Sequence, residues 1–203
     1  MKIKRLTNFW GRALVLSLAV AGCGDASNDG GGGTTLSHSG PVNIRLDKFK
    51  DDEVRNNAFD ADKSVNSESG NPYGAFLQAA RTALGAQFNP DTPGAAVVVD
   101  RVTLTIDQDT RGVTAFEQVL GGPLTVYLAS SSTTVNIGSV AQPTGAGPVE
   151  VTLSADRAAL EPIRRDLLAG SFKVGIRVPA AAMRPSNFDM RIATTLYFRA
   201  VIQ

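Results

Sequence analysis

Apolar and polar residues alternate along several segments of this 203-residue chain, and this alternation constrains the fold more than any other feature. The longest such segment is 190–202, MRIATTLYFRAVI. Within it, Ile192, Leu196 and Phe198 share one parity and therefore one face of a strand, because strand side chains point to opposite faces in turn. One apolar face and one polar face are typical of an antiparallel sheet that packs on one side only.

Six further segments have the same alternation or a short run of β-branched residues. They are 42–46, 97–106, 124–129, 135–137, 149–153 and 172–178. In 97–106 the apolar phase shifts by one residue at Asp100-Arg101, which predicts a β-bulge inside one strand. About seven strands separated by turn residues predict a mainly β fold, an antiparallel two-sheet β-sandwich that resembles immunoglobulin-like domains in architecture.

Two short segments have helical rather than strand periodicity. Residues 73–84 repeat apolar side chains at helical spacing, and Gly85 follows as a stop signal. Residues 155–169 do the same, with Pro162 marking a new helix start and Gly170 its end. We expect these two helices to cover open ends of the sandwich.

The beginning of the chain has the pattern of a targeting segment. Residues 1–12 contain four basic residues and no acidic one, and residues 13–22 are apolar except for Ser17. Ten residues make about 15 Å of α-helix, half of the roughly 30 Å hydrocarbon core, so this run is too short to cross a membrane. A basic start followed by a short apolar run is typical of a secretory signal peptide.

The apolar run ends in the sequence VAGC at residues 20–23, and Cys23 is the only cysteine of the chain. This sequence resembles the lipobox of bacterial lipoproteins: an aliphatic residue and two small residues before an obligatory cysteine. The resemblance implies a diacylglyceryl thioether on Cys23, removal of residues 1–22 as the signal peptide, and acylation of the new amino terminus. Two or more acyl chains hold a protein stably on a bilayer.

Residues 23–40 are predicted to be a lipidated, flexible linker, because they are rich in Gly, Ser, Asn and Asp. Residues 41–203 follow as a single β-sandwich domain of common size. By the lipoprotein resemblance, Asp25 stands one position too late for inner-membrane retention, which favours the outer membrane. The sequence thus predicts an exported protein that is lipid-anchored to the cell envelope.

Composition argues against several classes of function. Without the four basic residues of 1–12 the chain keeps 16 basic and 19 acidic residues, so no basic surplus favours nucleic acid as a partner. The only histidine, His38, falls in the predicted linker, where no packing would hold an imidazole for catalysis. We therefore expect neither enzymatic activity nor a cofactor beyond the lipid on Cys23. A hydrolase that uses paired carboxylates is an open alternative.

A calcium site is a second alternative. Asp60, Asp62, Ser64 and Asn66 stand at alternate positions, which is the first-third-fifth-seventh spacing of calcium ligands in an EF-hand loop. However, the sixth position is Val65, where such a loop has glycine for its sharp turn. The competing interpretation is a solvated polar loop without a metal.

The polar stretch 47–71 has little periodicity and predicts a long irregular loop, a feature that is usually functional or disordered. Tyr73 beside it and the loop 88–94 are further candidates for contact with a partner. Taken together, we expect a non-catalytic binding, scaffolding or assembly role, with the membrane and another envelope protein as partners. The alternative functions are a calcium- or carbohydrate-binding, adhesin-like module and the carboxylate hydrolase.

Overall fold

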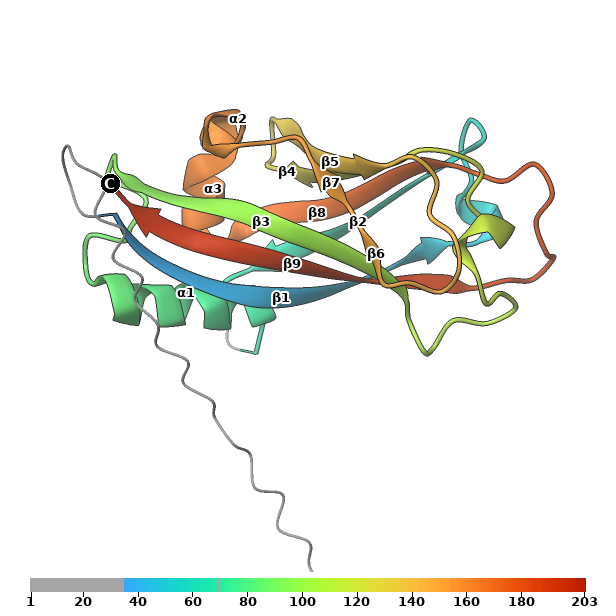
Figure 1. Cartoon of the computed structure of the whole chain (residues 1–203), viewed down its shortest axis with the longest axis horizontal. Helices are drawn as coiled ribbons and strands as arrows, with labels where there is room; N and C mark the ends of the chain where they lie inside the picture. Colours follow the sequence, from blue (N-terminus) through green and yellow to red (C-terminus); the bar gives the residue numbers. More distant parts are fainter. Residues whose placement is uncertain (1–34, 69) are drawn as a thin grey trace, which may run out of the picture. The chain divides into compact units, whose positions relative to one another are not determined.

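The computed structural model describes residues 35–68 and 70–203, in which two antiparallel sheets pack against each other (Figure 1). The strands are β1 (Leu36–Phe49), β2 (Ala58–Asn66), β3 (Ala95–Ile106), β4 (Leu124–Ala129), β5 (Thr134–Val140), β6 (Val149–Glu150), β7 (Thr152–Leu153), β8 (Ser171–Pro179) and β9 (Met190–Ile202). The helices are α1 (Pro72–Leu84), α2 (Arg157–Leu160) and α3 (Arg164–Ala169), with 3-10 turns η1 (Asp51–Glu53), η2 (Phe116–Gln118) and η3 (Glu161–Ile163). One sheet has the order β1-β9-β3-β6 and the other β2-β8-β4-β5-β7. The predicted mainly β sandwich is confirmed, with nine strands in the described residues instead of about seven.

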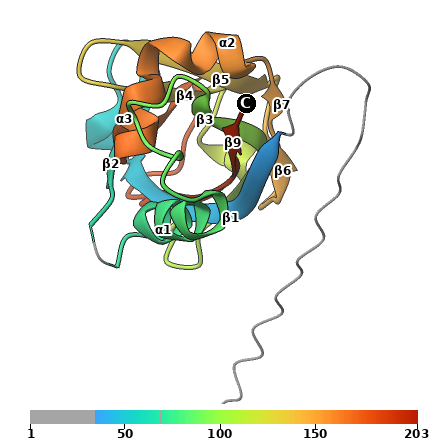
Figure 2. The ribbon, with the colours of Figure 1, turned by 90° about the vertical axis from the view of Figure 1, so that its left-hand side faces the viewer.

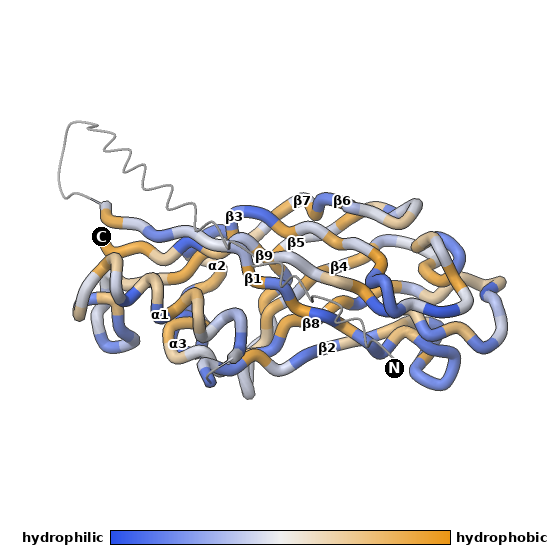
Figure 3. Tube along the Cα trace, turned by 90° about the horizontal axis from the view of Figure 1, so that it is seen from below, coloured by the Kyte–Doolittle hydropathy of each residue, from blue (hydrophilic) through white to orange (hydrophobic). Residues whose placement is uncertain are grey.

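Alternation along the strands decides which side chains form the core, and Figure 3 shows it as hydrophilic and hydrophobic positions that alternate along the trace. β9 lies between β1 and β3, and its Ile192, Leu196 and Phe198 side chains are fully buried between the sheets. The register between β3 and β9 shifts between Val99 and Arg101, which confirms the bulge predicted at that point.

The two sheets are joined by short connections on both sides of the sandwich. On one side β1 leads through η1 into β2. On the other side β6 and β7 are one extended segment that changes sheets at Val151, a buried residue whose N–H donates to the carbonyl oxygen of Val102. Each sheet edge therefore continues directly into an edge of the other sheet.

The helices gather at the end of the sandwich where β9 finishes (Figure 2). α1 packs against β1, and α3 packs against β3 and β8. Asn71 caps α1 by accepting a hydrogen bond from the Tyr73 N–H at 3.0 Å. The predicted helix stops are confirmed: Gly85 follows α1 with a φ of 77°, and Gly170 follows α3 with a φ of 72°. These positive φ values favour glycine over residues with a Cβ atom.

The folded part begins earlier than predicted, because β1 starts at Leu36 and not at residue 41. Residues 36–40 pair with β9, and His38 lies opposite Ala200. The linker prediction is therefore wrong for these five residues: pairing with a neighbouring strand orders a segment that has few apolar residues of its own. Cys23 and the predicted signal peptide lie outside the described residues.

The predicted irregular loop at 47–71 is also wrong over much of its length. β1 continues to Phe49, and residues 58–66 form β2, which pairs with β8. Phe59 and Val65 of β2 are buried, but Lys63 occupies an inward position between them and interrupts the alternation. A strand whose apolar face is broken by a charged residue does not show the sequence pattern of a strand.

Candidate functional site

Four connections between strands meet at the end of the sandwich opposite Leu36, the right-hand end in Figure 1. They are residues 50–57, 107–123, 141–148 and 180–189, and we call them the distal loops. Antiparallel pairing places them together: Phe49 pairs with Met190, and Ala58 pairs with Pro179. Alternate connections of an antiparallel sandwich necessarily emerge at the same end, so the topology gathers segments that are far apart in the sequence.

Backbone hydrogen bonds fix the distal loops to one another. The N–H of Ala180 donates to the Asn57 carbonyl oxygen at 2.8 Å. The N–H of the next residue, Ala181, donates to the Val119 carbonyl oxygen at 2.7 Å. One pair of consecutive residues therefore joins three of the four loops, 50–57, 107–123 and 180–189, which together form one continuous surface.

Three asparagines of the distal loops have positive φ angles, at 51° for Asn56, 59° for Asn57 and 59° for Asn187. Asparagine enters the left-handed region more readily than most residues with a Cβ atom, because its short amide can hydrogen-bond to the local backbone. These residues make the tight turns that close the loops beside η1 and before β9.

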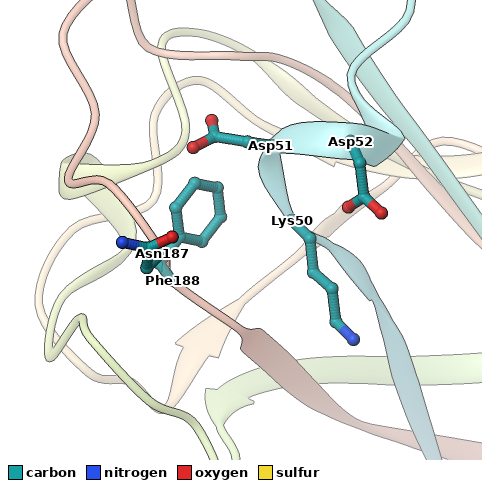
Figure 4. Close-up of a pocket in the computed structure, with 5 residues that line it drawn as sticks. All are labelled: Lys50, Asp51, Asp52, Asn187 and Phe188. Carbon is teal, nitrogen blue, oxygen red and sulfur yellow. The ribbon is translucent and has the colours of Figure 1, made fainter.

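The first of two pockets in the distal loops has a volume of about 420 Å³ and lies between the η1 turn and the start of β9 (Figure 4). It is lined by Lys50, Asp51, Asp52, Asn187 and Phe188. Phe188 is almost entirely buried and packs edge-to-face on Phe59 at a centroid distance of 6.4 Å, so the apolar part of the pocket is rigidly supported. Asp51 accepts a hydrogen bond from Arg184 Nε at 3.2 Å, which connects η1 to the loop 180–189.

The second pocket has a volume of about 380 Å³ and is lined by Gln108, Asp109, Thr110, Arg111 and Arg191. Thr110 Oγ1 donates to the Arg191 carbonyl oxygen at 3.2 Å and accepts from the Arg191 N–H at 3.0 Å, so the loop 107–123 is fixed to the first residues of β9. Asp189 connects the two pockets, because it pairs with Arg191 Nη2 at 3.2 Å and with Lys50 Nζ at 3.7 Å.

The distal loops carry an excess of acidic residues, with seven Asp and Glu against four Lys and Arg. They also contain Met183 in the loop 180–189, a residue that is 91% exposed. In residues 35–68 and 70–203, no three His, Cys, Asp or Glu side chains lie close enough together to hold a metal ion. The distal loops thus offer polar and charged groups together with an exposed apolar side chain, a composition that suits contact with another macromolecule.

The structure does not bring the predicted calcium ligands together. Asp60, Asp62, Ser64 and Asn66 occupy consecutive outward positions of β2. At about 3.3 Å per residue the first and last of them are roughly 20 Å apart, whereas calcium ligands lie about 2.3–2.6 Å from one ion. The prediction of a calcium loop is corrected: the spacing of two belongs to a strand.

The two aspartates of β2 are instead held by neighbouring cations. Asp60 accepts hydrogen bonds from Arg177 Nη2 at 2.8 Å and from the Tyr127 hydroxyl at 2.7 Å. Asp62 pairs with Lys48 at 3.3 Å and with Lys173 at 3.2 Å. Burial alone would raise the pKa of the Asp62 carboxyl, but the hydrogen bonds from the two lysines outweigh it and lower the pKa.

Tyr73 is fully buried and is not available to a partner, so its prediction as a contact residue is wrong. Its hydroxyl donates to the Leu167 carbonyl oxygen of α3 at 2.8 Å, and burial raises its pKa above the ordinary range of tyrosine. The loop 88–94 lies at the opposite end from the distal loops, where the Arg164 guanidinium donates to carbonyl oxygens of this segment at 3.2 and 3.3 Å. Both features stabilise the packing of helices at that end.

Residues 180–189 of the site were not found from the sequence, because they form a connection rich in turn residues with no motif of its own. Asp107 and Asp109 did stand out in the sequence, but only as a second fragment of a calcium loop, in which Arg111 falls near the position of the metal; in the structure Asp109 pairs with Arg45 and Arg191. The usable signal is topological: once seven antiparallel strands are expected, every second connection shares an end. Neither a protein-family model nor a curated protein matches this chain. None of the helices in the described residues is long and apolar enough to cross a membrane.

Proposed function

We propose that this protein is a membrane-anchored envelope lipoprotein that binds another envelope protein through the distal loops and has a non-catalytic, scaffolding or assembly role. The lipobox resemblance around Cys23 supports the anchor. The observation that carries the binding role is the set of interlocked distal loops, which presents an exposed methionine and two pockets on a rigid support.

The position of the distal loops fits a protein that is held from its amino-terminal side. The chain enters the sandwich at Leu36, at the end opposite the distal loops. The twelve residues between Cys23 and Leu36 reach at most about 45 Å when fully extended. The 14 residues of β1 then carry the chain a further 45 Å or so toward the distal loops. An anchor on Cys23 would thus leave these loops free to face away from the bilayer.

Confinement to a membrane surface adds to the binding. It raises the effective concentration of two partners that share one bilayer, so that a contact of moderate affinity is occupied. We expect the exposed Met183 side chain to be central to such a contact, because methionine adapts its shape to an apolar surface, and we expect the charged residues of the distal loops to set the orientation of the partner.

Site-specific photocrosslinking in intact cells tests this proposal. A photoreactive amino acid at Met183 should capture one recurrent envelope protein. The matched control position is Ser131, an exposed residue in the connection between β4 and β5 at the other end of the sandwich. Equal capture from both positions, or no capture from Met183, would contradict the binding role. The anchor is tested separately: Cys23→Ser should release the protein from the membrane fraction.

A further inference from the structure

Residues 182–187 of the distal loops form a short segment that is held firmly at both of its ends. Before it, the N–H of Ala181 donates to the Val119 carbonyl oxygen at 2.7 Å. After it, Phe188 is almost entirely buried and packs on Phe59. Between these two points, no backbone group of 182–187 forms a hydrogen bond with another residue of the described chain. The conformation of the segment therefore depends on its side chains.

Arg184 is the residue of this segment whose side chain makes polar contacts with the rest of the described chain. Its Nε donates to Asp51 Oδ1 of η1 at 3.2 Å, and its Nη1 donates to the Ala181 carbonyl oxygen. The side chains of Arg184 and Asp51 are 24% and 51% exposed, and an ion pair in contact with water contributes little to stability. Its clearer consequence is local: the guanidinium is turned back onto the protein, and its charge is neutralised there.

Met183 precedes Arg184 and is directed to solvent. Arg184 stands before Pro185, and a residue before proline is restricted to extended conformations. Successive side chains of an extended chain point to opposite sides, so Met183 points away when Arg184 turns toward η1. The 91% exposure of Met183 agrees with this, and Ala182 and Ser186 are exposed as well. Apart from Arg184 the segment has no charged residue, so it presents an uncharged surface to a partner.

We propose that the partner protein receives Met183 in an apolar recess that offers no carboxylate to Arg184, and that Asp51 supplies this counter-charge from within the chain. The inference rests on the binding role proposed above for the distal loops. Contact with an apolar surface removes water from the neighbouring Arg184, and a guanidinium that loses water without a paired carboxylate is strongly unfavourable. In the opposite arrangement a carboxylate of the partner would bind Arg184, and Asp51 would compete with it.

Photocrosslinking of the full-length protein in intact cells tests the proposal, with the photoreactive amino acid at the exposed Ser186 so that residues 183 and 184 can be varied. Asp51→Asn should lower capture of the partner about tenfold, because it leaves Arg184 unpaired at the contact. Arg184→Gln removes the charge together with the need to neutralise it, and it should lower capture by less than about fivefold. The variant with both substitutions should recover the capture of Arg184→Gln alone.

Two matched comparisons separate this effect from a general change of charge or shape. Asp52→Asn removes the neighbouring carboxylate, which forms no ion pair within the described residues and points in a different direction from Asp51 (Figure 4). It should leave capture unchanged. Met183→Leu keeps an apolar side chain and should retain capture within about twofold, whereas Met183→Gln, of similar length but polar, should lower it about tenfold.

The outcomes distinguish this inference from the binding role on which it rests. No capture by the otherwise unchanged protein, from Ser186 or from Met183, would contradict the binding role itself. Capture that rises in Asp51→Asn, or that falls most in Arg184→Gln, would overturn the apolar recess in favour of a carboxylate on the partner. Equal capture by Asp51→Asn and Asp52→Asn, or no recovery in the variant with both substitutions, would overturn the proposed role of Asp51. All varied side chains contact water, so the variants should keep the far-ultraviolet circular dichroism of the wild type.

Discussion

Thr194→Val is expected to stabilise the sandwich, although it removes a polar group from the middle of a sheet. Thr194 lies in β9 with 0% of its surface exposed, and it is directly opposite Ile44 of β1 and Leu104 of β3. Its hydroxyl has no hydrogen-bond partner in the part of the chain that the structure describes. The wild type therefore buries a polar group between apolar neighbours without compensation.

The size of the effect follows from the desolvation of that hydroxyl. Leaving a buried hydroxyl without a partner costs about 1–3 kcal/mol, and valine replaces it by a methyl group of nearly the same shape. Both residues are β-branched and favour strands, so the backbone preference changes little. We expect the free energy of unfolding to rise by about 1–2 kcal/mol, which for a domain of this size raises Tm by about 3–6 °C.

Equilibrium urea unfolding of the wild type and the variant at one pH measures this difference. The matched control is Thr195→Val at the next position, where the hydroxyl lies on the outer face and donates to Asn43 Oδ1 at 2.7 Å. This control should lose up to about 1 kcal/mol because it breaks a hydrogen bond. If Thr194→Val is neutral or destabilising, the hydroxyl has a partner inside the core and the reasoning fails.

Three further substitutions test other parts of the structure. Gly175→Ala would place a Cβ atom against the Tyr127 ring, and it should lower the free energy of unfolding by about 1–3 kcal/mol. Because burial and the hydrogen bond to Asp60 raise the pKa of Tyr127, a displaced ring should titrate closer to the ordinary value of about 10 in an ultraviolet titration. An unchanged pKa would show that the ring does not move. Tyr73→Phe should cost about 1 kcal/mol in urea unfolding, because it removes the hydrogen bond to the Leu167 carbonyl oxygen, and no loss would argue against that bond. Asp62→Asn should lower the free energy of unfolding by less than about 1 kcal/mol at neutral pH, measured by urea unfolding. The pKa of Asp62 is lowered in the folded state, so this difference should disappear as the pH falls below the ordinary value of about 3.9 and through the lower folded-state value. A difference that persists in strong acid would show that it is not electrostatic.

The elements that could be predicted are those whose signal is local. The strand 97–106 showed its bulge in the phase of its apolar residues, and Gly85 and Gly170 marked helix ends by a conformation that glycine alone adopts at little cost. Residues 36–40 lack such a signal. They are ordered by pairing with β9, which lies more than 150 residues later in the chain, and only the three-dimensional structure supplies that partner.

The candidate site was harder to predict because one pattern has two physical explanations. Polar residues at every second position between 60 and 66 fit both a metal-binding loop and the outer face of a strand. The structure decides in favour of the strand, since Asp60 and Asp62 pair with basic residues of β1 and β8. The distal loops carry no motif that relates one loop to another, and they become a site only because antiparallel topology brings them to one end.

β2 was not recognised from the sequence because Lys63 interrupts its apolar face. A regular apolar face is what identifies a strand in a sequence, and it is also what allows one strand edge to pair with another and bury the joined face. A charge in an inward position removes both properties at once.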